Sequence, residues 1–175
     1  MVANSGGGGF PPIDKATLED WDQQIGLNLD SAFLCDVAAG KVMLEQGSGK
    51  IINISSTAGI NLNPSLPAYA AAKAGVINLT KTLAVIWAAK NVNVNCIAPG
   101  FIATDGIRKA GHVPPDTRKD GTKVPPLLMP ADPQHVADTA VFLASEGARH
   151  VTGELMIVRG MLHMERSNDV LRDRA

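Results

Sequence analysis

The sequence predicts an α/β fold with a doubly wound parallel sheet, and three consecutive segments indicate it. Residues 49–55 are a β-branched apolar run that leads into hydroxyl groups and glycine, which is typical of a buried strand opening into a loop. Residues 67–90 begin with proline and continue with strong helix formers, so they predict a helix. A second apolar strand over 92–98 is stopped by Pro99 and Gly100.

The first part of the chain predicts a strand and a long helix. A short strand over 1–4 is followed by a loop to about residue 15. The helix is expected from Thr17 to about Gln46, because residues 17–20 resemble a capping box at a helix start.

The last part of the chain predicts a loop, a helix and a final strand. Residues 105–129 are rich in glycine, proline and charge and show no clear periodicity. A helix is expected over 132–145 because its apolar side chains share one face, and residues 155–158 are the expected last strand. The chain therefore divides into one α/β domain over 1–160 and a frayed or solvated tail over 161–175.

Composition argues against several classes of function. The net charge of −1 gives no basic field for nucleic acid, and 4% aromatic residues leave few platforms for stacking bases. No apolar run reaches about 18 residues, so no membrane span is expected. Without a signal-peptide pattern, a cytoplasmic location is expected. Cys35 and Cys96 are interpreted as packing residues, although the sequence leaves a disulfide open.

The four histidines show none of the spacings that metal ligands adopt in helices, so no metal site is expected.

Tyr69 and Lys73 are the first candidates for catalysis. Four residues are just over one helical turn, so the phenol and the ammonium project from one face of the predicted helix. A nearby cation favours the ionised form of a phenol, which suits a general acid or base. The pair alone also occurs by chance in many helices. Ser56 and Pro99, however, are expected at the same carboxyl edge of the sheet, where open α/β folds bind ligands.

These motifs, in this order, resemble the short-chain dehydrogenase/reductase family, especially its 3-oxoacyl-carrier-protein reductase type. The resemblance covers residues 2–158 and includes Asn4-Ser5-Gly6, the helix around Asn28, the Ile-Asn-Ile-Ser-Ser strand end, Tyr-x-x-x-Lys, and the segment from Asn95 through Pro99 to Thr104. It implies a partial Rossmann-type sheet, strands four to seven of the family fold, with flanking helices. It also implies that Asn28 interrupts its helix and that residues 105–129 form a lid over the substrate.

The resemblance implies a role for each catalytic candidate. Tyr69 would exchange the proton with a carbonyl or alcohol oxygen. Lys73 would support the ionised phenol and bond the nicotinamide ribose, and Ser56 would orient the substrate oxygen. Asn28 would hold a water molecule in a proton relay. Without the resemblance, Asn28 is as well explained by a helix residue that bonds backbone, and Ser56 by an ordinary strand-end serine.

The resemblance also implies cofactor contacts and a substrate class. NAD or NADP would lie against Asn4, Ser5, Gly6, Tyr69, Lys73, Pro99, Gly100, Ile102 and Thr104. The substrate would be a small alcohol or ketone. Ala3 replaces an asparagine of the family pattern, which puts one sheet-stabilising hydrogen bond in doubt.

One family feature has no counterpart in the 175 residues. The Thr-Gly-x-x-x-Gly-x-Gly loop that cradles the pyrophosphate is absent, and so are the residues that would select NAD or NADP. The glycines of residues 6–9 lead into Phe10 and two prolines rather than a helix, and Ile51 replaces the Ser or Thr that a phosphate loop over 47–51 would need. We therefore expect the chain to lack the N-terminal cofactor-binding portion and to bind NAD(P) weakly or not at all.

Two functions remain open from the sequence. The first is an NAD(P)-dependent oxidoreductase that interconverts a secondary alcohol and a ketone. The second is a noncatalytic remnant, or an oligomerisation partner that cannot hold the dinucleotide alone. The resemblance implies a homodimer or homotetramer that packs through the Asn28-containing helix and the Tyr69 helix. In the Tyr69 helix, Val85, Ile86 and Trp87 predict an apolar face. Ile86 could also simply complete packing within the chain.

Overall fold

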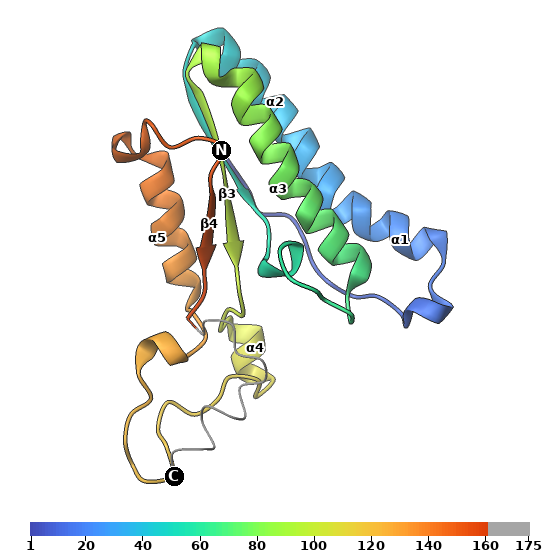
Figure 1. Ribbon diagram of the computed structural model, residues 1–175, viewed down its shortest axis with the longest axis vertical. Coiled ribbons are helices and arrows are strands. Elements are labelled where there is room, and N and C mark those ends of the chain that lie inside the picture. The colour runs from blue at the N-terminus through green and yellow to red at the C-terminus, as the bar shows by residue number, and fades with distance from the viewer. Residues whose placement is uncertain (161–175) are drawn as a thin grey trace.

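The computed structural model describes residues 1–160, and the predicted tail lies outside these residues. Four parallel strands form one sheet in the order β1-β2-β3-β4. They are β1 (Val2–Ala3), β2 (Gly49–Ile54), β3 (Val92–Pro99) and β4 (Leu155–Val158). The sheet confirms the predicted α/β class, and all four carboxyl ends meet at one edge, where the segments that follow the strands gather (Figure 1).

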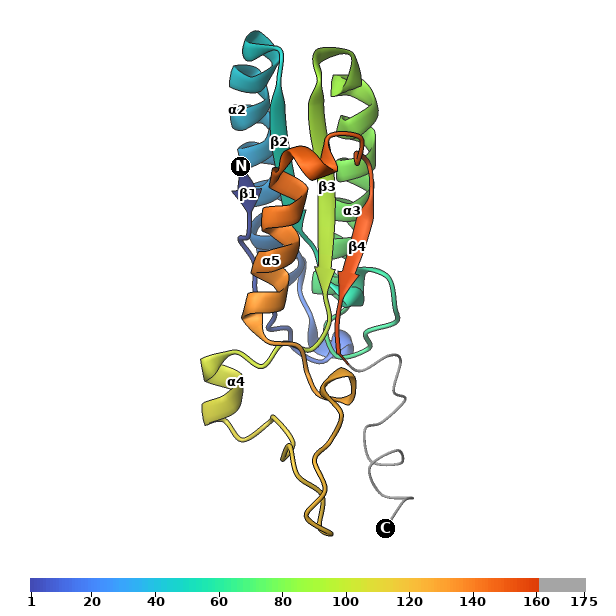
Figure 2. The same ribbon diagram turned by 90° about the vertical axis from the view of Figure 1, so that its left-hand side faces the viewer.

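Helices cover both faces of this sheet, as Figures 1 and 2 show from two directions. On one face lie α2 (Ser31–Gln46) and α3 (Pro67–Trp87), and on the other lies α5 (Pro133–Ala144). Side chains alternate along β2 accordingly, because neighbouring residues of a strand point to opposite faces. Ile51 packs with the α3 residues Leu83 and Trp87, whereas Ile52 packs with Leu143 of α5.

The predicted long helix is two helices joined by a wider turn. Thr17 caps α1 (Leu18–Ile25), and its side chain and that of Asp20 bond each other's backbone amides, so the capping box is confirmed. Residues Gly26–Asp30 form one π-helical turn before α2 begins. The turn contains Asn28, so the predicted interruption is confirmed. Extra turns of this kind occur frequently at functional sites.

The segment over 105–129 extends away from the carboxyl edge of the sheet (Figure 2). It contains a helix that the sequence did not predict, α4 (Asp105–Lys109), because five residues are too short to show a helical period. Arg108 ties this helix to the domain. Its guanidinium donates to the Ala103 carbonyl at 2.9 Å and pairs with Asp132, the residue that caps α5, at 2.9 Å.

The two cysteines differ in environment. Cys96 is fully buried in β3, so its predicted packing role is confirmed. Cys35 is exposed, and its predicted packing role is wrong because the next residue of α2, Asp36, is the one that faces the core. Both thiols are free.

No helix within residues 1–160 is long and apolar enough to cross a membrane. The same residues contain no group of three or more potential metal ligands.

A close contact between α2 and α3 leads to the first testable prediction. A Cβ added at Gly40 would lie 2.5 Å from the Trp87 ring, which is itself buried. Overpacking of this kind costs about 1 to 3 kcal/mol, and the better helix propensity of alanine returns up to about 1 kcal/mol. Gly40→Ala is therefore expected to lower the free energy of unfolding by about 1 to 2 kcal/mol.

Urea denaturation followed by circular dichroism measures this change. Gly106→Ala is the matched control, because a Cβ at that helical glycine meets nothing within 4 Å. Equal stability of the Gly40→Ala variant and the control would contradict the packing described here.

Candidate active site

Lys73 is held at the carboxyl edge of the sheet by backbone groups. Its side chain leaves α3 and is almost fully buried. The ammonium donates to the Ile54 carbonyl at 3.0 Å and to the Ser5 carbonyl at 3.3 Å, so it joins the ends of β2 and β1. Burial lowers the pKa of Lys73, because a desolvated ammonium loses hydration that two carbonyls replace only in part. The third N–H remains available to a ligand or to a phenolate.

Tyr69 lies one helical turn before Lys73, as the spacing predicts. The Lys73 Nζ atom is 5.8 Å from the centre of the Tyr69 ring, within the range of a cation–π contact. The phenol is half-buried, so it can meet both the protein and a ligand. The Lys73 ammonium therefore lies beside the aromatic ring of this side chain.

Asn28 belongs to the same group of side chains but uses its carboxamide to bind protein. It is fully buried, and its Oδ1 atom accepts from the Gly7 amide at 3.1 Å. Its Nδ2 atom donates to the carbonyls of Gly7 and Gln24, both at 3.0 Å. The side chain thereby anchors the glycine loop after β1 to the π-helical turn.

Gly6 lies where Asn28 and Lys73 converge. A Cβ at this position would lie 2.7 Å from Asn28 Oδ1 and 2.8 Å from Lys73 Nζ. The glycine thus lets the chain after β1 pass directly against both side chains. The sequence placed these three residues in one site, and the structure brings them together.

Ser56 follows β2 directly, and its neighbour Ser55 has a different role. The Ser56 hydroxyl accepts from the Ala58 amide at 3.1 Å, which leaves its own proton free to donate. The Ser55 hydroxyl is buried and donates to the Lys73 carbonyl at 2.7 Å. Ser55 therefore bonds backbone, and Ser56 presents a free donor.

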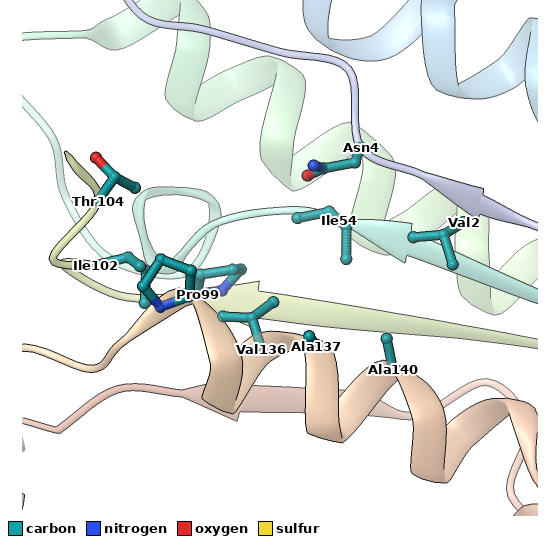
Figure 3. A pocket seen from close by; sticks show the side chains of 10 residues that line it. Val2, Asn4, Ile54, Pro99, Ile102, Thr104, Val136, Ala137 and Ala140 are labelled. Atoms are coloured by element: carbon teal, nitrogen blue, oxygen red, sulfur yellow. The ribbon is translucent and has the colours of Figure 1, made fainter. Parts of the chain in front are cut away.

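A pocket of about 470 Å³ lies at the same edge, between the strands and α5 (Figure 3). Four predicted cofactor residues line it, namely Asn4, Pro99, Ile102 and Thr104. Its other walls are apolar and come from β1, β2 and α5. Ser56, Tyr69 and Lys73 do not line it, because α3 covers the opposite face of the sheet. The site thus consists of an apolar pocket on one face and hydroxyl and ammonium groups on the other.

Thr104 and one further predicted residue, Gly100, make contacts with backbone groups. Thr104 caps α4 by accepting from the Ile107 amide at 3.4 Å. The Gly100 amide donates to the Val158 carbonyl at 2.9 Å, and a Cβ there would lie 2.7 Å from the Arg159 Cβ atom. The glycine therefore allows the loop after β3 to lie against the end of β4.

The sequence did not reveal several groups that shape the site. The carbonyls of Ser5 and Ile54 bind Lys73, but a carbonyl exists at every residue and carries no sequence pattern. Gln24 is buried, and its Oε1 atom accepts from Asn28 Nδ2 at 3.3 Å. Gln24 precedes Asn28 by four residues, about one helical turn, and this spacing could have predicted the contact between the two side chains.

Comparison with known proteins identifies the family of the chain. The family described as Enoyl-(Acyl carrier protein) reductase matches residues 1–163. The chain belongs to the short-chain dehydrogenase/reductase family.

Relatives of known sequence and structure support this assignment. A 3-oxoacyl-[acyl-carrier-protein] reductase from Synechocystis is 45% identical over 151 residues, which are 86% of this chain and 59% of that protein. The acetoin dehydrogenase YohF from Salmonella typhimurium superposes with a TM-score of 0.78 at 31% identity, over 91% of this chain and 62% of that one.

A 3-oxoacyl-[acyl-carrier protein] reductase from Brucella melitensis, whose structure contains bound NAD, superposes with a TM-score of 0.75 at 29% identity, over 93% of this chain and 61% of that one. The chain thus spans about three-fifths of the length of these relatives.

Proposed function

We propose that the protein to which this chain belongs is an NAD(P)-dependent oxidoreductase that interconverts a secondary alcohol and a ketone. One observation carries the proposal. The Lys73 ammonium is buried between two strand ends, next to Gly6 and one helical turn from Tyr69. A desolvated cation beside a half-buried phenol is the arrangement that proton transfer to a carbonyl oxygen requires.

The chain's own residues supply the proton and the orientation. When a ketone is reduced, the Tyr69 O–H bond breaks and an O–H bond forms on the former carbonyl oxygen. The Lys73 ammonium stabilises the phenolate left behind. Ser56 donates its free proton to the same carbonyl oxygen and fixes its direction, while Asn28 holds the glycine loop against Lys73.

The residues at the strand ends suit the nicotinamide end of a dinucleotide. NAD(P)H supplies the hydride that accompanies the proton when the cofactor is bound. Pro99 and Ile102 form part of an apolar wall that suits an aromatic ring, and Asn4 and Thr104 add polar residues to the same lining. The free N–H of Lys73 suits a ribose hydroxyl. NAD bound to the Brucella relative supports this class of cofactor.

The names of the relatives support a ketone or secondary alcohol as the substrate class. They act on a 3-oxoacyl group and on acetoin. We propose that the segment over 105–129 covers the substrate, because Thr104 and the Arg108–Asp132 pair connect it to the edge of the pocket.

Cofactor oxidation at 340 nm, measured with a panel of ketones, tests the proposed function. NADH and NADPH are supplied in the millimolar range, because the chain contains no glycine-rich phosphate loop and weak binding is expected. Turnover that increases with cofactor concentration is the expected result. No oxidation of either cofactor with any ketone would contradict the proposed function.

We further propose that two copies of the chain pair through the outer surface of α2 and α3. Val42, Val85 and Ile86 leave an exposed apolar surface there, which we name the α2–α3 face. Ile86 is 61% exposed and so does not complete packing within the chain, whereas Trp87 is turned into the core. Exposed apolar surface of this kind marks protein interfaces.

Val85→Asp is expected to convert the dimer to a monomer, because it places a charge in the apolar α2–α3 face. Sedimentation velocity measures the change. Leu62→Asp is the control, since Leu62 is 97% exposed and lies outside the α2–α3 face. A wild-type chain that sediments as a well-folded monomer would overturn the interface.

A further inference from the structure

The turn after Ser56 lies against the backbone of α3 at Lys73 itself. A Cβ added at Gly59 would lie 2.7 Å from the Lys73 carbonyl carbon, 2.7 Å from the Ala74 nitrogen and 2.9 Å from the Lys73 oxygen. These atoms belong to a helix backbone and cannot rotate away as the end of a side chain can. A side chain at position 59 would therefore push the turn, and Ser56 with it, away from α3.

A buried hydrogen bond holds the same point of α3 from the strand. The Ser55 hydroxyl donates to the Lys73 carbonyl at 2.7 Å. Ser55 is itself fixed, because its amide donates to the Ile97 carbonyl of β3 at 2.8 Å. Residue 55 thus links the sheet to the helix one position before Ser56.

The ammonium of Lys73 adds a third link, to the Ile54 carbonyl at 3.0 Å. Along the chain, Ser56 therefore lies between two segments that contact α3 at Lys73. Ile54 and Ser55 precede it, and Gly59 follows it. Tyr69 lies one turn earlier on the same rigid helix. These contacts therefore set the position of the Ser56 hydroxyl relative to the Tyr69 phenol.

We propose that Ser55 and Gly59 are positioning residues that set Ser56 relative to Tyr69. Neither contacts the substrate. The hydroxyl of Ser55 fixes the strand end, and the missing side chain of Gly59 sets how closely the turn approaches α3. The inference rests on the proposed function of Ser56 and Tyr69 as the pair that binds and protonates the substrate oxygen.

Steady-state kinetics of Gly59→Ala and Ser55→Ala give the first test. A displacement of about 1 Å in a reactive group lowers a rate about 10²-fold. We expect kcat to fall by about this factor with a smaller change in KM, because the relative position of Ser56 and Tyr69 sets the geometry of proton transfer in the chemical step. Ser55→Thr, which keeps the hydroxyl, is expected to restore most of kcat. Gly9→Ala is the control, since a Cβ there meets nothing within 4 Å.

The ring signals of Tyr69 give a second test that needs no turnover. Tyr69 is the only tyrosine in the sequence, so carbon-13 labelling of tyrosine reports this ring alone. The signals are expected to move in Gly59→Ala and Ser55→Ala and to stay in place in Gly9→Ala. Unchanged signals in a folded Gly59→Ala variant would overturn the proposal. If Gly59→Ala does not fold, Ser55→Ala decides by the same criterion.

The two tests separate the two ideas. A wild-type protein without turnover would contradict the proposed function, and the Tyr69 signals would still decide whether Ser55 and Gly59 position the turn. Turnover with unchanged kcat and unchanged signals in both variants would contradict the positioning role alone.

Discussion

Replacing Tyr69 by phenylalanine is expected to lower the rate of ketone reduction by about 10²- to 10⁴-fold, the usual contribution of a positioned general acid. The variant keeps the ring that contacts Lys73 at 5.8 Å and removes only the hydroxyl that we propose gives the proton. Folding and the packing of α3 should therefore be unaffected. The loss should fall on kcat, because the proton is transferred in the chemical step.

The comparison requires two controls. The unfolding curve of Tyr69→Phe should match that of the wild type, which shows that the fold is intact. Phe142→Tyr, a change that adds a phenol to the half-exposed face of α5, should keep the wild-type rate. Wild-type kcat in Tyr69→Phe would show that another group supplies the proton.

Replacing Asp36 by asparagine is expected to stabilise the protein at pH 7.5 and to have little effect at pH 4. Asp36 is fully buried in α2, and burial raises its pKa to about 6, against a hydrogen bond from Asn53 that lowers it. Asn53 Nδ2 donates to Asp36 Oδ2 at 2.9 Å, whereas Asp36 Oδ1 and Asn53 Oδ1 have no hydrogen-bond partner. A proton on Asp36 supplies the donor that these two acceptors lack.

Among the residues that the structure describes, none supplies a charge that compensates Asp36. Thr80 of α3 bonds Asn53 and the Val76 carbonyl, and burial raises the pKa of Cys96 in β3 to about 11, so the thiol is neutral. Asp36 takes part in no ion pair within residues 1–160. The carboxylate is therefore unfavourable in the folded state.

The sign of the pH dependence follows from linkage. Because the pKa of Asp36 is higher in the folded state than in the unfolded state, the folded state binds the proton more tightly. The contribution of protonated Asp36 to stability is therefore complete below the ordinary pKa of 3.8. It is lost as the pH rises through about 6. A pKa shift of this size corresponds to about 3 kcal/mol. The Asp36→Asn substitution should therefore raise the free energy of unfolding at pH 7.5 by about 1 to 3 kcal/mol.

Urea unfolding of the wild type and Asp36→Asn at pH 4 and pH 7.5 measures the effect. Asp30→Asn, a change at an exposed carboxylate near the start of α2, should show no such difference between the two pH values. A variant that is less stable than the wild type at pH 7.5 would show that Asp36 is favourable as a carboxylate.

The sequence predicted the sheet and the central helices because their patterns are long and unambiguous. The apolar strands β2 and β3 end at residues that turn the chain, and α3 begins with proline and runs over 21 residues. By contrast, α4 is too short to show a period. Cys35 was misplaced because a single residue of a helix gives no information about which face it occupies.

The candidate residues were predictable by type, but their partners were not. Tyr69 and Lys73 follow from helical spacing, whereas the carbonyls that hold Lys73 depend on how separate strands end side by side. The same is true of Gly59, whose proposed role depends on a close approach to α3 that only coordinates reveal.

A crystal structure of the protein with NAD(P)⁺ and a secondary alcohol tests the central proposal most directly, through the distances from the alcohol oxygen to Tyr69 Oη and Ser56 Oγ. The proposed function predicts that both lie within about 2.6 to 3.2 Å, the range of a hydrogen bond that can carry a proton. An alcohol oxygen that contacts neither hydroxyl would contradict it.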